Sequence, residues 1–335
     1  MGTILELPHR VKAGMCPVNG IRDLVQWRTG RDWSNELVWG LAQGGGFAYL
    51  RFDRADPPRQ IYTGNSTARQ HKYLAKLLRA DLVEVENRAF AFSWQKARQA
   101  VDAGTPPVLG PLDMYYLHYF QGLYHARHIP IHYVLLVGYD DQNAFILDTS
   151  EDAMQAIPLE ELRQAWDVNV PGLGKHNRLA VLNIPRELPP TAQLIREALA
   201  DNCQAMLHPP VSLAGIPAMR KAAREIPRWP AELGAETADR CLRQAREYLN
   251  SPPDLEGNHL TAGRDLIITA FTEAGELAGL RIAAVVEGLR RSMEIVPRLA
   301  AALRQGELTA ASSCLAQMAD AEEAAYMALQ KSLAQ

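Results

Sequence analysis

Three residues that together can perform nucleophilic catalysis occur in the chain in the order cysteine, histidine, aspartate. Cys16 stands directly before Pro17, His132 begins the run HYVLLVGYD, and Asp148 ends the run AFILD. A cysteine nucleophile needs a base to take its proton and an acid to orient that base and stabilise the imidazolium. We therefore predict a triad of Cys16, His132 and Asp148.

Cys16 has the most suggestive setting of the four cysteines. The apolar spacing after it predicts a helix over 17–29 that ends at Gly30, and proline suits a first helical turn because it has no N–H. Unpaired amides at a helix N-terminus favour a thiolate and can face an oxyanion on a substrate carbonyl. The alternative is a merely packed thiol, which is the usual state of a lone cysteine. The other three cysteines lie in helical patterns typical of small buried hydrophobes: Cys203, Cys241 and Cys314.

His132 and Asp148 are expected to meet because two predicted strands, 133–140 and 144–149, are joined by the polar turn DDQN. In an antiparallel hairpin of this length the start of one strand lies beside the end of the other. Taken singly, His132 could be a hydrogen-bonded residue at a strand start and Asp148 a turn or capping acid. Together with Cys16, the catalytic interpretation is favoured.

The elements around these residues indicate an α+β fold in the first half of the chain. Helices are predicted at 66–80 and 93–103, the latter capped by Ser93 and ended by Gly104. Short β-branched or aromatic runs bounded by turn residues predict strands at 46–53, 81–87, 106–116, 133–140, 144–149 and 179–185.

The second half of the sequence is almost wholly helical. Prolines in IPRELPPTAQ disfavour a continuous element, so we place a domain boundary there and predict domains at 1–186 and 187–335. Pro-rich loops, HPPVSLAGIP, IPRWP and SPPDLEGNH, separate the helical patterns, and we expect a bundle of four to six helices. These patterns cover 191–206, 235–250, 262–304 and 307–333.

The composition excludes several classes of partner. The 335 residues carry a formal net charge of −3 with no basic block, which argues against nucleic acid and anionic membrane surfaces. The N-terminus lacks the pattern of a signal peptide and no apolar run is long enough to span a bilayer, so we expect a cytoplasmic protein. No cysteine pair has the spacing of a zinc or disulfide motif, and we expect small-molecule or protein partners.

Three stretches carry a resemblance to a known family. They are CPVNGIRDLVQWRTGRDWSNELVWGLAQGGGFAY (16–49), AVDAGTPPVLGPLDMYYLHY (100–119) and HYVLLVGYDDQNAFILDTS (132–150). In this order they resemble the butirosin biosynthesis protein H N-terminal family, which has a papain-like cysteine fold. The stretch LEGNHLTAGRDLIITAFTEAGEL (255–277) loosely resembles the helical domain of unknown function, DUF4872, that commonly follows it.

The resemblance implies an α+β papain-like catalytic domain followed by an all-α domain, and an acyltransferase activity. The family's catalytic cysteine, histidine and acid fall on Cys16, His132 and Asp148. The implied reaction moves an acyl, aminoacyl or peptidyl group from a carrier-protein thioester onto an amine or peptide in specialised-metabolite biosynthesis. It needs no bound cofactor, since the phosphopantetheine arm of an acyl or peptidyl carrier protein brings the substrate.

The sequence departs from the family pattern beside two of these residues. Met15 stands where members often have histidine, and Ile131 stands where they usually have a small residue. Papain-like enzymes also carry a glutamine upstream of the cysteine that completes the oxyanion hole, and LPHRVKAGM has none. Asn19 or Gln43 could supply the amide instead, and the Cys16 N–H is a further donor.

Two further segments are candidates for contact with substrate. The segment GLAQGGGFAY matches the family's Gly-rich turn near the active site, where Gly44 and Gly45 could contact substrate or simply form a tight turn before a strand. The aromatic segment 115–132 is expected to form a loop over the cleft, with Tyr115, Tyr116 and His118 in the acceptor pocket. Its four histidines lack the carboxylate or cysteine that would complete a metal site, so we expect no metal.

Three functions remain open from the sequence. The first is the amine acyltransferase; the second is a cysteine hydrolase, such as a thioesterase, amidase or peptidase, which uses the same triad with water as acceptor. The third is a non-catalytic protein that binds or stabilises a carrier protein in a nonribosomal peptide pathway. The helical domain is expected to form one wall of the cleft or a homodimer contact.

Overall fold

A computed structural model of the chain describes residues 4–12, 15–249 and 261–335. Contacts divide the chain into two compact units. The first contains Met1–Ala42 and Ser66–Pro189, and the second contains Gln43–Asn65 and Pro190–Gln335. Residues 43–65, which we placed in the first domain, thus group with the second unit, and the boundary at 186 stays a prediction. The expected loop SPPDLEGNH lies outside the described residues.

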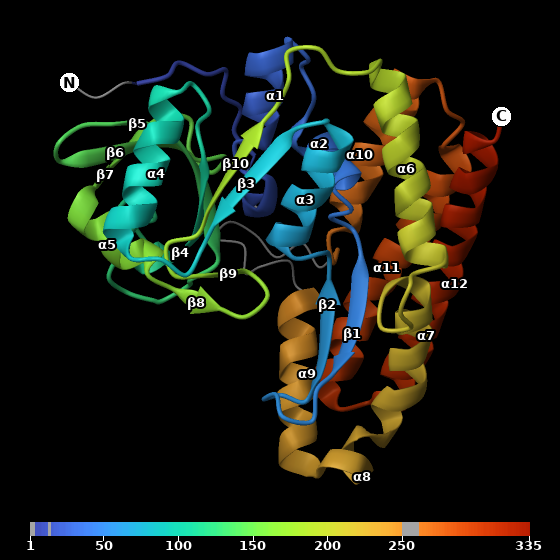
Figure 1. Cartoon of the computed structure of the whole chain (residues 1–335). Coiled ribbons are helices and arrows are strands. Elements are labelled where there is room, and N and C mark those ends of the chain that lie inside the picture. Colours follow the sequence, from blue (N-terminus) through green and yellow to red (C-terminus); the bar gives the residue numbers. More distant parts are fainter. Residues whose placement is uncertain (1–3, 13–14, 250–260) are drawn as a thin grey trace. The chain divides into compact units, whose positions relative to one another are not determined.

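The first unit is built on a six-stranded antiparallel sheet of order β3-β10-β4-β5-β6-β7. Figure 1 shows β10, from the end of this unit's sequence, beside β3. A separate ribbon pairs β8 (Asn169–Val170) with β9 (Gly174–Lys175). The strands of the main sheet are β3 (Asp81–Val85), β4 (Val108–Leu112), β5 (His132–Tyr139), β6 (Asn143–Leu147), β7 (Gln155–Pro158) and β10 (Leu179–Asn183).

The helix expected over 17–29 is broken into two pieces. A 3-10 turn, η1 (Cys16–Val18), is followed by Gly20 with φ 76° and then by helix α1 (Ile21–Thr29). A Cβ on Gly20 would lie 2.4 Å from Leu135 Cβ, so glycine lets the chain turn and approach β5 at the same point. The other helices are α2 (Asn35–Leu41), α3 (Thr67–Leu77), α4 (Phe90–Asp102), η2 (Met114–Tyr116) and α5 (Leu159–Trp166). Helix α4 begins at Phe90, before the cap expected at Ser93.

Strand β5 lies at the centre of the first unit and is buried along seven of its eight residues. Leu135 faces Gly20, which follows η1. Val134 and Leu136 belong to a core that includes Trp94 of α4 and Trp166 of α5. Helices thus cover both faces of β5, which explains why its sequence is a continuous apolar run with no alternation.

The second unit joins a β-hairpin to helices. Strand β1 (Phe47–Arg51) pairs antiparallel with β2 (Arg59–Thr63), which the strand patterns did not predict. The Tyr49 hydroxyl donates to Glu225 Oε2 over 2.7 Å and accepts from Trp229 Nε1 over 3.1 Å. The helices are α6 (Thr191–Leu207), α7 (Gly215–Glu225), η3 (Ile226–Arg228), α8 (Trp229–Leu233), α9 (Ala235–Leu249), α10 (Arg264–Ala278), α11 (Ala283–Gln305) and α12 (Leu308–Leu333).

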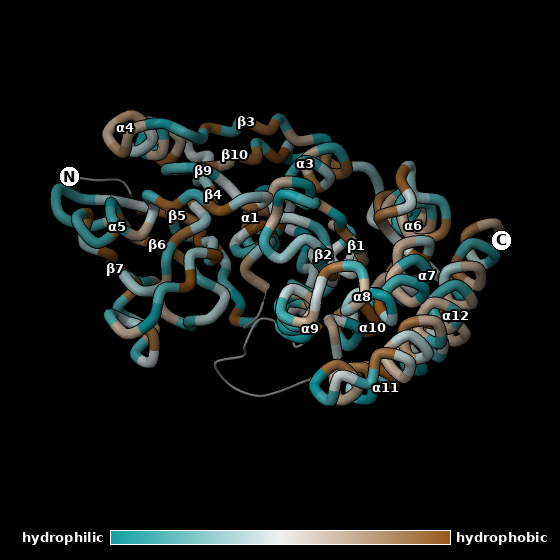
Figure 2. Tube along the Cα trace, turned by 90° about the horizontal axis from the view of Figure 1, so that it is seen from below, coloured by the Kyte–Doolittle hydropathy of each residue, from teal (hydrophilic) through white to brown (hydrophobic). Residues whose placement is uncertain are grey.

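These helices differ from the prediction in several places. Among the described residues there are seven α-helices, α6 to α12, where four to six were expected. Helix α7 was not predicted, and it begins inside the expected loop HPPVSLAGIP. The pattern 262–304 is two helices, because the chain turns at Gly279 with φ 63°. The segment IPRWP is helical, since its prolines occupy first-turn positions of η3 and α8. Hydrophilic and hydrophobic residues alternate along α11 and α12 (Figure 2). In the described part of the chain, no helix has both the length and the apolar character needed to cross a bilayer. The α+β fold followed by a helical region is confirmed.

Candidate functional site

The hairpin of β5 and β6 brings His132 and Asp148 together. Its register pairs Leu135 with Leu147 and Leu136 with Ile146, so the start of β5 lies beside the residue that follows β6. His132 Nε2 is 2.6 Å from Asp148 Oδ2, and both side chains are buried. The pair therefore has the geometry of a base and its orienting acid.

The Asp148 carboxylate accepts four hydrogen bonds. Oδ2 accepts from His132 Nε2 and from the Tyr119 hydroxyl, the latter over 2.7 Å. Oδ1 accepts from Asn19 Nδ2 and from the Ser150 N–H, each over 2.9 Å. All four donors favour the ionised carboxylate.

The charges of the pair stabilise one another. Burial alone would raise the pKa of Asp148, but the His132 charge and the hydrogen bonds outweigh it and the pKa falls to about 2. Burial likewise works to lower the pKa of His132, and the Asp148 carboxylate reverses this and raises the pKa to about 10. At neutral pH the arrangement thus favours an imidazolium held by a carboxylate.

Cys16 lies near His132, since interaction with the Cys16 side chain is among the causes that raise the pKa of His132. Asp148 binds Nε2 of the ring, so Nδ1 is the nitrogen that Asp148 does not use. Cys16 Sγ also lies 3.8 Å from the Ile131 carbonyl oxygen. The thiol is half-buried, whereas Met15 before it is fully buried. The structure thus brings the three predicted triad residues together, with His132 bonded to Asp148.

Asn19 ties the turn that carries Cys16 to both strands of the hairpin. Its Nδ2 donates to the Tyr133 carbonyl over 2.7 Å and to Asp148 Oδ1, and its Oδ1 accepts from the Thr149 N–H over 3.1 Å. Both amide hydrogens are engaged, so none is left for an oxyanion. In this structure Asn19 therefore has a structural role, linking the Cys16 turn to residues 133, 148 and 149.

His71 of α3 supports the same turn from another direction. Its Nε2 lies 2.9 Å from the Pro17 carbonyl oxygen, which can only accept, so Nε2 carries the hydrogen. Complete burial and the nearby Arg178 charge lower the pKa of His71 to about 3, so the ring is neutral. His71 is a fixed neutral donor to the residue after Cys16.

The aromatic loop between η2 and β5 reaches the site through a residue that we did not predict. Tyr119, and none of Tyr115, Tyr116 or His118, donates to Asp148. Tyr115 stacks on His128 with ring centroids 4.1 Å apart. The role of Tyr115, Tyr116 and His118 in an acceptor pocket stays a prediction.

Ionisable side chains in this loop form pairs. His128 Nδ1 lies 2.6 Å from Asp113 Oδ2, and His125 Nε2 lies 3.8 Å from Glu161 Oε2. Within 4–12, 15–249 and 261–335, no group of three or more His, Cys, Asp or Glu residues is placed to hold a metal ion.

The other oxyanion candidates, Gln43, Gly44 and Gly45, belong to the second compact unit. There the Gln43 carbonyl accepts from Asn65 Nδ2 over 2.8 Å, and a Cβ on Gly45 would collide with Ile267 Cδ1 at 1.9 Å. Within the second unit these residues close the base of the hairpin against α10. Their contact with a substrate stays a prediction.

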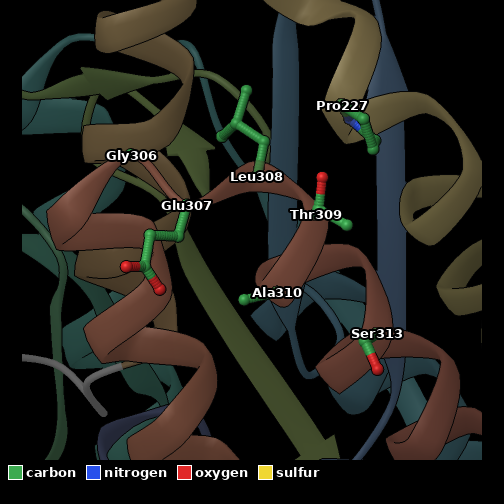
Figure 3. A pocket seen from close by; sticks show the side chains of 7 residues that line it. All are labelled: Pro227, Gly306, Glu307, Leu308, Thr309, Ala310 and Ser313. Carbon is green, nitrogen blue, oxygen red and sulfur yellow. The ribbon is translucent and has the colours of Figure 1, made fainter.

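Two surface hollows are lined by residues other than those of the triad. One, of about 410 Å³, is in the first unit and is lined by Asn87, Arg88, Ala89, Phe90, Arg163, Asp167, His176 and Asn177. The other, of about 720 Å³, is in the second unit beside the turn between α11 and α12 (Figure 3). Its lining residues are Pro227, Gly306, Glu307, Leu308, Thr309, Ala310 and Ser313.

Three residues of the site were not predicted from the sequence. Tyr119 lies in the aromatic loop, one position beyond His118. His71 and His9, which contacts the turn after Asp148, stand alone in their segments. A lone histidine gives no spacing signal, and only the tertiary contacts reveal its partners.

Comparison with known proteins gives two family matches, one after the other along the chain. Residues 15–149 match the family described as butirosin biosynthesis protein H, N-terminal, and residues 160–251 match the domain of unknown function DUF4872. No curated protein matches the chain. A crystal structure described as that of a C39-like peptidase from Bacillus anthracis is 18% identical, with a TM-score of 0.37. The match covers 54% of this chain and 97% of that one.

Proposed function

Residues 15–149 belong to the butirosin biosynthesis protein H N-terminal family, and from this premise we propose that the protein is a cysteine acyltransferase. The observation that carries the proposal is the row of Cys16, His132 and Asp148, in which a half-buried thiol meets a histidine held by a buried carboxylate. The arrangement is that of a cysteine enzyme, and the family name supports a biosynthetic reaction. The proposed donor is a carrier-protein thioester and the proposed acceptor is an amine.

In the first step the Cys16 sulfur attacks the thioester carbonyl as a thiolate. A C–S bond to Cys16 forms, the C–S bond to phosphopantetheine breaks, and the departing thiolate takes the proton held by His132. Exchange of one thioester for another is close to isoenergetic, so no cofactor is needed. Asp148 keeps the ring oriented while its charge changes.

In the second step an amine attacks the acyl group on Cys16. The amine proton passes to neutral His132, a C–N bond forms, and the C–S bond to Cys16 breaks, which restores the thiolate and the imidazolium. Water in place of the amine would give a hydrolase by the same steps, and exclusion of water from the acyl-enzyme separates the two outcomes.

The test is intact-mass spectrometry after incubation with a panel of acyl-phosphopantetheine thioesters. We expect wild type to gain the mass of the acyl group and Cys16→Ala to gain nothing. Cys203→Ala is the matched control, because burial raises the pKa of that thiol to about 12 and keeps it unreactive. It should label as wild type does.

Adding amines to the labelled protein then decides the acceptor. Release of an amide supports the transferase, whereas release of free acid at the same rate with and without amine indicates the hydrolase. If no thioester labels wild type and iodoacetamide alkylates Cys16 no faster than a free thiol, the catalytic proposal fails. A non-catalytic role in binding a carrier protein would then be the favoured function.

A further inference from the structure

His9, in the segment before Cys16, contacts the backbone that carries the acid. Its Nε2 lies 3.1 Å from the Asp148 carbonyl oxygen and 2.8 Å from the Glu151 carbonyl oxygen. Carbonyl oxygens only accept hydrogen bonds, so Nε2 carries a hydrogen and shares it between the two. The ring therefore bridges both ends of the turn that follows β6.

The other ring nitrogen is held by a buried carboxylate. His9 Nδ1 lies 2.7 Å from Asp23 Oδ2, and Asp23 in α1 is fully buried. The Asp23 Oδ1 atom accepts from Arg22 Nη1 over 3.0 Å. With acceptors at both nitrogens, the ring fits its site as an imidazolium with two N–H groups.

The charges around His9 come from α1 and from the turn. Burial works to lower the pKa of His9, but the hydrogen bond to Asp23, those to the two carbonyls, and the Asp23 charge together raise it. The positive charge of Arg22 disfavours a positive charge on His9, but Arg22 is itself paired with Asp23 and Asp32. The Asp148 carboxylate is hydrogen-bonded to His132 and Tyr119, whereas His9 contacts the Asp148 backbone carbonyl.

Backbone bonds on either side of His9 attach the same segment to the hairpin. Leu5 N–H donates to the Val137 carbonyl over 2.8 Å, and Lys12 N–H donates to the Thr149 carbonyl over 2.7 Å. Residues 4–12 thus run along β5 to the turn, where His9 supplies the side-chain link to α1.

We propose that His9 is a positioning residue for the catalytic acid, fixing the turn 148–151 to α1 through Asp23 so that the Asp148 carboxylate stays aimed at His132. This inference rests on the proposed function, since it assigns His9 a task only if Asp148 orients the base. The turn has an internal bond, from Glu151 N–H to the Asp148 carbonyl over 2.9 Å. His9 binds that same carbonyl and connects the turn to the element that follows Cys16.

The test measures iodoacetamide alkylation of Cys16 against pH, read by mass spectrometry, in full-length variants with a native near-UV spectrum. Misplacement of the acid's turn by a fraction of an ångström should slow alkylation at pH 6 in His9→Ala by about 10- to 100-fold. His9→Gln keeps one donor for the carbonyls and should give an intermediate rate. The matched control is His176→Ala, which removes an equally short His–Asp pair, 2.6 Å from His176 Nδ1 to Asp167 Oδ1, without touching the turn.

Asp148→Asn separates this inference from the proposed function. If Asp148→Asn slows alkylation and His9→Ala does not, the His9 inference is overturned and the triad stands. If Asp148→Asn reacts as wild type does, the proposed function fails and the His9 inference fails with it. Should His9→Ala not fold, His9→Gln decides, because a wild-type rate in that variant would overturn the inference and an intermediate rate would support it.

Discussion

Asp148 shows how single residues settle the chemistry of this site. A buried carboxylate would ordinarily be destabilised, and here four hydrogen-bond donors, one of them the His132 imidazolium, reverse that cost. The Asp148 carboxylate in turn stabilises the protonated ring of His132. Because each charge shifts the pKa of the other group in the folded chain, the pair makes a pH-dependent contribution to folding.

The first prediction concerns that pH dependence. The pKa of Asp148 falls to about 2 from an ordinary 3.8, so its contribution is present above pH 3.8 and is lost as pH falls towards 2. The pKa of His132 rises to about 10 from 6.5, so its contribution is full below pH 6.5 and is lost as pH rises through 10. Urea unfolding of wild type and Asp148→Asn should give a free-energy difference that is flat from about pH 4 to 6.5 and falls outside that window. A difference that does not change between pH 6 and 10 would contradict it.

A second prediction concerns Asn19, which is fully buried and bonded to three groups. Asn19→Ala leaves the Thr149 N–H without its side-chain partner and removes two donors, so we expect a loss of roughly 2–4 kcal/mol in the free energy of unfolding. Asn35→Ala is the control, since buried Asn35 donates a single bond, to the Arg10 carbonyl. Equal losses in the two variants, measured by urea denaturation, would show that Asn19 has no special role.

At the scale of elements, the break between η1 and α1 sets the position of Cys16. In a continuous helix from Pro17, the direction of the Asn19 side chain would be set by the helix alone. The left-handed Gly20 turns the chain, so Asn19 instead reaches the Tyr133 carbonyl and the Thr149 N–H. The short 3-10 turn packs against β5 and α3.

The third prediction tests this close approach. Gly20→Ala meets two costs, the left-handed φ of 76° and a contact of 2.4 Å with Leu135 Cβ, and should lose roughly 2–5 kcal/mol of stability. Gly30→Ala has nearly the same φ, 73°, and nothing within 4 Å of the new Cβ, so it should lose about 1 kcal/mol. Chemical denaturation of both variants separates strain from collision. Equal losses of stability in the two variants would mean that Leu135 moves aside at no energetic cost.

At the scale of the whole molecule, the two compact units are interleaved along the sequence. The hairpin of β1 and β2 follows α2 in the chain, yet its side chains are bonded to the later helices. Tyr49 bonds Glu225, and the backbone of Ile61 bonds Gln244 at both its N–H and its carbonyl. An isolated two-stranded hairpin is marginal in water, so these bonds are what keep it formed.

The fourth prediction follows from that dependence. In a fragment of residues 1–189 the hairpin loses the partners of Tyr49 and Ile61, and we expect the amides of 47–51 and 59–63 to exchange with deuterium at nearly unprotected rates. In the full chain the same amides should be protected. Hydrogen-exchange mass spectrometry of both proteins measures this. Equal protection in the fragment would show that the hairpin folds with the first unit.

The sequence by itself determined most of the local structure of the first half of the chain. Apolar runs and turn residues predicted β1, β3, β4, β5, β6 and β10, because short-range patterning controls which segments can be strands. The hairpin geometry of β5 and β6 also predicted that His132 and Asp148 meet, since a short polar turn fixes the register. Most helices of the second half followed from the same periodicity. The exceptions are α7, which no pattern predicted, the helices that begin at prolines, and the pattern that Gly279 splits in two.

Only the tertiary structure decided the supporting contacts of the site. Tyr119 and His9 reach Asp148 across separations of 29 and 139 residues, and no local pattern encodes such a contact. The engagement of both Asn19 hydrogens and the grouping of 43–65 with the helices likewise depend on which surfaces pack together. Residue types specify what a side chain can donate or accept, and the fold decides which partner it meets, because long-range contacts are set by the packing of elements and not by spacing along the chain.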